Sequence, residues 1–213
     1  MEHIDIYDAN MRRLGSMERM AAHRAGHWHQ TVHFWLVDRE QGGRLFFQLR
    51  GPAVRANPDR LDATAAGHML AGETLSAGWR EVREELGIDI PPIVHELGFR
   101  TEVSDMPDGD VNREFQAIYL AEAPSGPEGF APDPAEVHGV LAIGISDLHN
   151  LIANRIEAVT ASGIIFAQGD ATWRPERRRV TMDALVPRFR NYYASVAIMA
   201  ERLVEGRWPL AIG

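Results

Sequence analysis

One segment, residues 67–88, constrains the fold of this chain more than any other. It places a glycine-containing loop before a short helix that carries three glutamates, Glu81, Glu84 and Glu85. Their spacing puts all three carboxylates on one helical face, where they repel one another unless a cation offsets the charge. Clustered carboxylate oxygens suit Mg²⁺ or Mn²⁺, and Mg²⁺ is usually bound together with substrate phosphates. A solvated acidic helix face is the simpler alternative for such a charge run.

The whole segment resembles the Nudix box, G-x5-E-x7-R-E-U-x-E-E-x-G-U, in which U is an aliphatic residue. The matching positions are Gly67, Glu73, Arg80, Glu81, Val82, Glu84, Glu85, Gly87 and Ile88. The chain departs from the pattern once, because one residue fewer separates Glu73 from Arg80. We expect the loop to absorb this deletion, which leaves the helical part intact and affects only where Glu73 lies.

The resemblance implies a metal-dependent hydrolase that cleaves a diphosphate linkage by attack of water on phosphorus. The substrate would be a nucleoside diphosphate linked to another moiety, or a similar organic diphosphate. Bound cations would neutralise it, orient it and lower the pKa of a bound water. The implied metal ligands are the carbonyl of Gly67, Glu73 through water, Glu81, Glu84, Glu85 and, on a later strand, Glu114.

Two further roles follow from the same resemblance. Arg80 would pair with Glu73 and hold the loop against the helix, an orienting rather than a chemical role. The general base stays open among Glu84, Glu81, Glu114 and Glu136, the last of which lies near the end of a proline-rich loop.

Histidine is frequent, with nine in 213 residues. Three of them stand in a pattern similar to that of the isopentenyl-diphosphate isomerases, a Nudix subfamily: Ala22-His23, then His29 before an aromatic-rich strand, then Gly67-His68 before the box. With Glu114 they would form a second metal site, since neutral imidazole and carboxylate suit Mn²⁺, Zn²⁺ or Fe²⁺. The alternative is that these histidines line the substrate cleft or cap strands.

The isomerase chemistry itself lacks a key group in this chain. The isomerases carry an essential cysteine just before the Gly-His, where this chain has Ala66 and no cysteine anywhere. Alanine has no ionisable group with which to move a proton at an allylic carbon. The closest resemblance is therefore to the hydrolase-type relatives of the isomerases. An isomerase-like protein and a non-catalytic ligand-sensing domain remain the alternatives, although sensors usually lose the box glutamates that are kept here.

Periodicity and turn signals predict a mixed sheet covered on both faces, an α/β/α sandwich of the α/β (α+β) class. Expected strands are 4–8, 31–37, 44–50, 94–103, 115–120 and 137–145, and expected helices are 147–158 and 182–205. Residues 16–24 are a short helix or a loop, and Thr74 or Ser76 is expected to cap the box helix, which ends at Gly87. The resemblance implies a Nudix domain over 28–148, between an N-terminal strand and helix extension at 1–27 and a C-terminal helical segment at 149–213.

Composition and charge limit the kinds of molecule that the chain is expected to bind. The net charge of −8 argues against a broad nucleic-acid surface, but a bound metal would still allow a small anionic substrate. No apolar run approaches a membrane span and the N-terminus is not a signal peptide, so we expect a cytoplasmic protein. The apolar face of the last helix is able to pack within the chain or against a second copy, so a homodimer stays an alternative.

Trp28 is interpreted as a core residue, and Arg50 and Arg55 as solvated or phosphate-facing. The arginine run at 174–179 is interpreted as an exposed turn.

Overall fold

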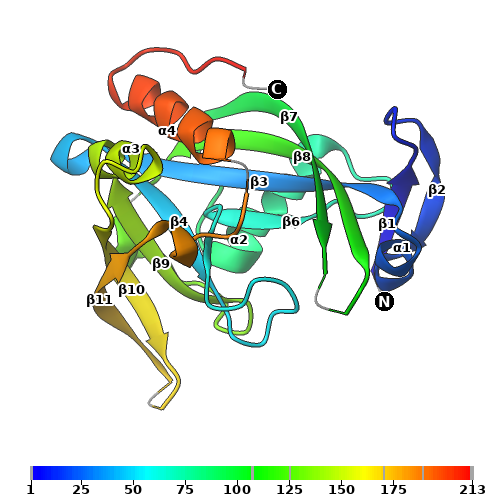
Figure 1. Ribbon diagram of the computed structural model, residues 1–213, viewed down its shortest axis with the longest axis horizontal. Coiled ribbons are helices and arrows are strands. Elements are labelled where there is room, and N and C mark those ends of the chain that lie inside the picture. Colours follow the sequence, from blue (N-terminus) through cyan, green and yellow to red (C-terminus); the bar gives the residue numbers. More distant parts are fainter. Residues whose placement is uncertain (1, 107, 125, 170, 189, 212–213) are drawn as a thin grey trace.

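The computed structural model describes residues 2–106, 108–124, 126–169, 171–188 and 190–211. Within these residues the strands form one sheet, and four α-helices pack against it (Figure 1). The strands are β1 (His3–Tyr7), β2 (Arg13–Glu18), β3 (Trp28–Asp38), β4 (Arg44–Arg50), β5 (Leu61–Asp62), β6 (Ala65–His68), β7 (Val94–Asp105), β8 (Val111–Glu122), β9 (Val137–Gly144), β10 (Val159–Ala167) and β11 (Thr172–Val180). The helices are α1 (Arg19–Ala25), α2 (Arg80–Leu86), α3 (Ile145–Ile152) and α4 (Arg190–Val204).

Strand β3 organises the sheet. It pairs in parallel with β8 from Trp28 to Val37. Along its other edge it pairs antiparallel with β1, then β6, then β4. The expected mixed sheet is therefore confirmed, and its central strand is the aromatic and β-branched run that predicted a strand.

Two apolar cores lie on opposite faces of this sheet. Side chains of β3 alternate between them, so that Phe34 packs with the box helix α2 and Trp35 packs with α3 and α4. Figure 1 shows α2 and α4 on opposite sides of β3. This is the expected α/β/α arrangement, and period-two alternation along a strand that is covered on both sides accounts for it.

The box helix α2 ends as expected and begins differently. Gly87 follows it with φ of 65°, and a Cβ there would lie 2.1 Å from the Ala131 carbonyl oxygen, so only glycine fits. The expected side-chain cap is absent: Thr74 Oγ1 lies 3.3 Å from Ser76 Oγ, and neither caps the helix. Instead a 3-10 turn, Leu75–Trp79, leads directly into α2, and the shortened Glu73–Arg80 spacing falls within it.

The last third of the chain differs from the helical segment that we predicted. Strands β10 and β11 form a hairpin that extends the sheet beyond β9. The arginine run lies on β11, where Arg177 pairs with Ser162, so its interpretation as a turn is wrong. An edge strand with charged side chains on both faces has no apolar alternation from which to recognise it.

The closing helix is also shorter than predicted. Met182–Ala184 form a 3-10 turn, an extended stretch through Pro187 follows, and α4 begins only at Arg190. Proline disfavours a helical conformation in the residue before it, which explains the late start. The helix expected at 147–158 likewise ends early, at Ile152. In residues 16–24, β2 ends at Glu18, whose carboxylate accepts hydrogen bonds from the first amides of α1.

Candidate active site

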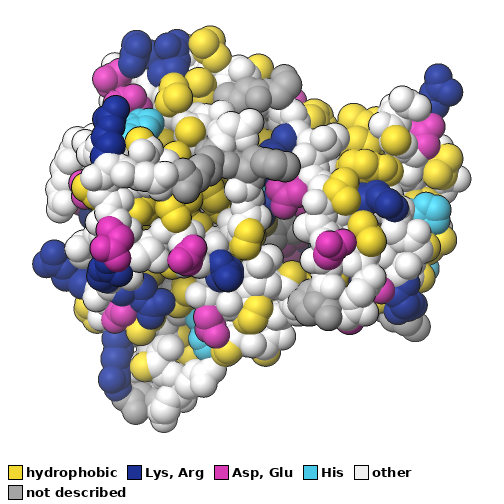
Figure 2. All heavy atoms as spheres, viewed as in Figure 1, with side chains coloured by type: hydrophobic (Ala, Val, Ile, Leu, Met, Phe, Trp, Pro, Cys, Tyr) yellow, Lys and Arg dark blue, Asp and Glu magenta, His cyan; other side chains and the backbone are white. Residues whose placement is uncertain are grey.

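One cavity of about 710 Å³ collects most of the residues predicted for the site, and Figure 2 shows a hollow in the middle of the face viewed there. From the box, its wall contains Gly67, Arg80, Glu81, Glu84 and Glu85. From the second predicted group, it contains His23, His68 and Glu114. Glu136, the fourth candidate for a general base, also lines the cavity. Residues of both predicted metal sites, the box glutamates and the histidine group, therefore line the same cavity.

Arg80 ties the loop, the helix and β6 together. Its Nε donates to Glu73 Oε1 at 3.0 Å, so the expected pair is present. A second nitrogen donates to Glu81 at 2.7 Å and Glu84 at 2.6 Å, and the third donates to the His68 carbonyl at 3.0 Å. Glu73 is fixed further by the Leu70 amide at 2.7 Å. A planar guanidinium with several fixed donors suits this orienting role.

Two box glutamates are buried against the backbone of β6. Glu85 accepts from the Ala66 amide at 2.8 Å. A Cβ added to Gly67 would lie 2.1 Å from Glu81 Oε1, so only glycine lets this carboxylate approach so closely. Burial raises the pKa of Glu81 to about 7 and raises that of Glu85 well above its ordinary value. Such carboxylates favour a cation, since a divalent ion reverses the effect of burial on the pKa.

The histidine group is compact. Ligand atoms of His23, His29 and His68 all lie within 4.8 Å of one another. Burial lowers the pKa of all three, in His23 to about 4, so the imidazoles are neutral at pH 7. His29 Nδ1 lies 3.0 Å from the His27 carbonyl, which accepts only, so the Nδ1 of His29 carries the proton and its Nε2 keeps a lone pair.

Glu114 completes this group. Its carboxylate lies 4.0 Å from His29 Nε2, and the side-chain amide of Gln116 donates to it at 2.5 Å. Burial opposes its ionisation, but the adjacent His68 and His29 hold the pKa of Glu114 below its ordinary value. Within the described chain, His29 Nε2 and His23 Nδ1 are buried without a hydrogen-bond partner. Orphaned imidazole nitrogens beside an ionised carboxylate fit a divalent cation.

Other predicted residues have different surroundings. Trp28 stacks on Phe115 with ring centroids 4.6 Å apart but is only partly buried, so it packs at the edge of the core rather than within it as predicted. Arg55 forms ion pairs with Asp108 and Asp110, and Arg50 pairs with Asp62 at 3.2 Å. Both arginines line the cavity, so neither is simply solvated.

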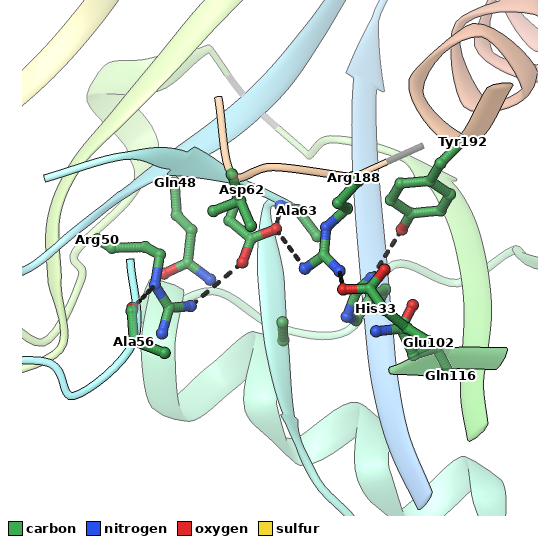
Figure 3. Close-up of polar contacts among 12 residues, drawn as sticks. His33, Gln48, Arg50, Ala56, Asp62, Ala63, Glu102, Gln116, Arg188 and Tyr192 are labelled. Atoms are coloured by element: carbon green, nitrogen blue, oxygen red, sulfur yellow. Dashed lines mark hydrogen bonds and ion pairs between the residues drawn. The ribbon is translucent and has the colours of Figure 1, made fainter. Parts of the chain in front are cut away.

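Sequence reasoning missed a buried ionic network at one end of the cavity (Figure 3). Arg188, just before α4, donates to Asp62 at 2.9 Å and to Glu102 at 2.7 Å. Burial would raise the pKa of Asp62, but Arg188 and Arg50 hold it well below its ordinary value. The one sequence signal was an acidic residue between apolar neighbours, Leu61-Asp62-Ala63. Its partners are distant in sequence, and no spacing rule connects them.

Comparisons with known proteins agree with this architecture. A model of the NUDIX domain matches residues 27–161, more than half of the chain. An uncharacterized Nudix hydrolase of Clostridium acetobutylicum is 34% identical over 198 residues, covering 92% of this chain and 95% of that protein. An isopentenyl-diphosphate Delta-isomerase of Streptomyces griseus subsp. griseus is 33% identical over 137 residues, covering 63% of this chain and 66% of the isomerase. A Deinococcus radiodurans protein of known structure has the same fold, with a TM-score of 0.55 at 22% identity over 71% of this chain and 90% of that one.

A mixed sheet between helices, with glutamates of one short helix facing a cavity, is the arrangement that the box segment predicted for a Nudix-type enzyme. The chain belongs to the Nudix family. It is accordingly a pyrophosphohydrolase, and enzymes of this family generally use divalent metal ions. Among the residues described, no helix is long and apolar enough to cross a membrane.

Proposed function

We propose that this enzyme hydrolyses the diphosphate linkage of an organic diphosphate, such as a nucleoside diphosphate joined to another moiety, with Mg²⁺ or Mn²⁺. The observation that carries the proposal is the burial of Glu81 and Glu85 at the wall of a cavity large enough for such a substrate. Glu81, Glu84, Glu85 and the Gly67 carbonyl would hold one ion, and Glu114 with His23, His29 and His68 would hold a second.

The chain's own residues supply orientation and proton transfer. A bound divalent cation offsets the diphosphate charge and acidifies a coordinated water. Arg80 fixes Glu81 and Glu84 relative to the glycine loop through its hydrogen bonds. Glu84, more than half exposed at the cavity and held by Arg80 through one carboxylate oxygen, is a candidate to accept a proton from the attacking water. Glu81 is the other candidate, because its carboxylate lies at the same cavity wall, against Gly67.

One residue in the cavity argues against the isomerase alternative. Ala66 lines the cavity beside Gly67 and His68, where a proton-transferring side chain would be needed, and its methyl group offers none. The ligand-sensor alternative fits the same cavity, but it gives no role to three box glutamates held on its wall. Neither alternative predicts release of a phosphate product.

A substrate panel tests the proposal. We would measure phosphate or monophosphate release from nucleotide sugars, dinucleoside polyphosphates, NADH, ADP-ribose, nucleoside triphosphates and isoprenoid diphosphates. Each would be incubated with Mg²⁺, with Mn²⁺ and with chelator. We expect metal-dependent cleavage of one class. Folded protein that binds metal but releases no product from any compound would contradict the proposal and favour an isomerase-like or sensing role.

A further inference from the structure

The N-terminal strand β1 packs against the loop of the box, although it precedes residues 27–161, which match the NUDIX domain. Ile4 forms an antiparallel bridge with Leu70, and the Ala71 amide donates to the His3 carbonyl at 2.8 Å. Figure 1 shows the N-terminal hairpin beside the segment that follows β6. Ile4 is fully buried, so this contact belongs to the packed interior. The box loop therefore has a support that the box motif itself does not include.

Asp5 extends this support to the next residue of the loop. One of its carboxylate oxygens accepts from the Gly72 amide at 3.0 Å, and the other accepts from Arg13 of β2 at 2.8 Å. Only 11% of the Asp5 side chain is exposed. The bond from Arg13 holds the pKa of Asp5 below its ordinary value although burial opposes ionisation, so the carboxylate is charged at neutral pH. A charged acceptor binds a backbone amide more strongly than a neutral one.

A short series of contacts connects this amide to the box glutamates. Gly72 precedes Glu73, whose carboxylate accepts from Arg80 Nε at 3.0 Å. Arg80 in turn donates to Glu81 and Glu84. Only one 3-10 turn separates Glu73 from Arg80. A shift of Glu73 is therefore expected to shift the guanidinium that orients the two carboxylates.

We propose that Asp5 is a positioning residue of the active site. Through the Gly72 amide it fixes the box loop, and thereby Glu73 and Arg80, so that the box glutamates are preorganised for a divalent cation. Asp5 lies outside the lining of the cavity, so its effect has to pass through the loop. The alternative is that Asp5 only stabilises the N-terminal hairpin through Arg13. This inference rests on the proposed function, in which the box glutamates bind Mg²⁺ or Mn²⁺.

Manganese binding tests the role without a known substrate. The dissociation constant of Mn²⁺ would be measured on the full chain by electron paramagnetic resonance, well below the melting temperature of every variant. Glu84→Gln identifies which binding step belongs to the box. Asp5→Ala should weaken this step about threefold to tenfold, the effect of one lost hydrogen bond. Asp5→Asn keeps an acceptor oxygen for the Gly72 amide and should bind Mn²⁺ within about twofold of the wild type.

Two further variants separate positioning from stability. Asp8 accepts two backbone amides in the turn between β1 and β2. Asp8→Ala should therefore lower the melting temperature and leave the affinity for Mn²⁺ unchanged. In a chain that already carries Glu73→Ala, adding Asp5→Ala should weaken Mn²⁺ binding by less than about twofold, because the two residues act in series.

Hydrogen exchange measures the loop directly and needs no metal. With chelator present, the Gly72 amide of the wild type should be protected, since it donates to a buried carboxylate. In Asp5→Ala this amide should exchange about tenfold faster or more, as followed by NMR. Asp8→Ala should leave the exchange rate of Gly72 unchanged.

The outcomes separate this inference from the proposed function. Wild-type Mn²⁺ affinity in Asp5→Ala, an unchanged exchange rate of Gly72, or an equal loss of affinity in Asp8→Ala would each overturn the positioning role, even if the chain hydrolyses diphosphates. Weaker binding and faster exchange, both reversed by Asp5→Asn, would support it even if no diphosphate were cleaved. A wild-type chain that binds no Mn²⁺ would contradict the proposed function, and the exchange of Gly72 would still decide whether Asp5 holds the loop.

Discussion

The three box glutamates stand on one short helix yet have different environments. Glu84 is more than half exposed and bonded to Arg80, whereas Glu85 is buried and held by the Ala66 amide. Helical spacing predicts that they share a face, but it does not predict which carboxylate is buried. That difference comes from β6, which packs over one end of the face, and the turn of the chain that brings β6 there is a tertiary feature.

Glu84 provides the sharpest test of the active site. Glu84→Gln removes one charge at nearly constant volume from the face that would bind the cation. We expect kcat to fall by about 100-fold or more, with an unchanged melting temperature because the side chain is exposed. Glu96→Gln, an exposed change on β7, is the control. Wild-type activity of the Glu84 variant at saturating Mg²⁺ would show that the site is wrongly assigned.

The histidine group makes a separate prediction. His68→Gln should remove one equivalent of bound Mn²⁺, because it replaces one of three neutral imidazoles that converge within 4.8 Å. Metal content after dialysis would be measured by mass spectrometry. His138→Gln, a histidine on β9 outside the group, should keep the wild-type content. Equal metal content in the two variants would mean that the histidines only line the cleft.

Among the elements, strands with apolar alternation and the box helix were predicted to within a few residues, and the hairpin of β10 and β11 was missed. The difference has a physical basis. β3 is covered on both faces, so most of its side chains are apolar or aromatic, whereas β11 lies at the sheet edge and carries charged side chains on both faces. The buried end of the cavity was missed for a related reason, because Asp62 and Arg188 are brought together by topology alone.

The stretch before α4 is anchored by charge. Arg188→Met should lower the free energy of unfolding by about 3 kcal/mol, since it removes the cation that bridges buried Asp62 and Glu102 and leaves them only Arg50 and Arg100. Urea titration would measure this, with Arg207→Met at an exposed position as the control. Adding Asp62→Asn to the Arg188 variant should recover part of the loss. A loss no larger than that of the control would mean that the network does not hold the stretch in place.

For the whole molecule, buried neutral histidines make stability depend on pH. His33 has a folded-state pKa of about 3, below its ordinary value of 6.5, so the unfolded chain binds the proton more readily. The contribution of neutral His33 to the free energy of unfolding is complete above pH 6.5. As the pH falls from 6.5 towards 3, this contribution is lost at about 1.4 kcal/mol per pH unit. Unfolding in urea with chelator should therefore show lower stability at pH 5 than at pH 7.

The variant His33→Gln isolates this contribution. It should lose stability at both pH values but show a smaller difference between them, by about 2 kcal/mol. The loss of stability caused by the substitution itself is the same at both pH values, so it cancels when the pH 5 to pH 7 difference of the variant is compared with that of the wild type. An unchanged difference between pH 5 and pH 7 would assign the pH dependence to other groups, such as His23.

The order in which the chain is made gives the Arg188 network a further consequence. Asp62 and Glu102 leave the ribosome well before the arginine that neutralises them, because Arg188 follows the β10–β11 hairpin. A growing chain that has reached residue 161, where the match to the NUDIX domain ends, therefore holds both carboxylates but not yet the arginine that bridges them. One side of the cavity wall is therefore supplied by a part of the chain outside the matched domain.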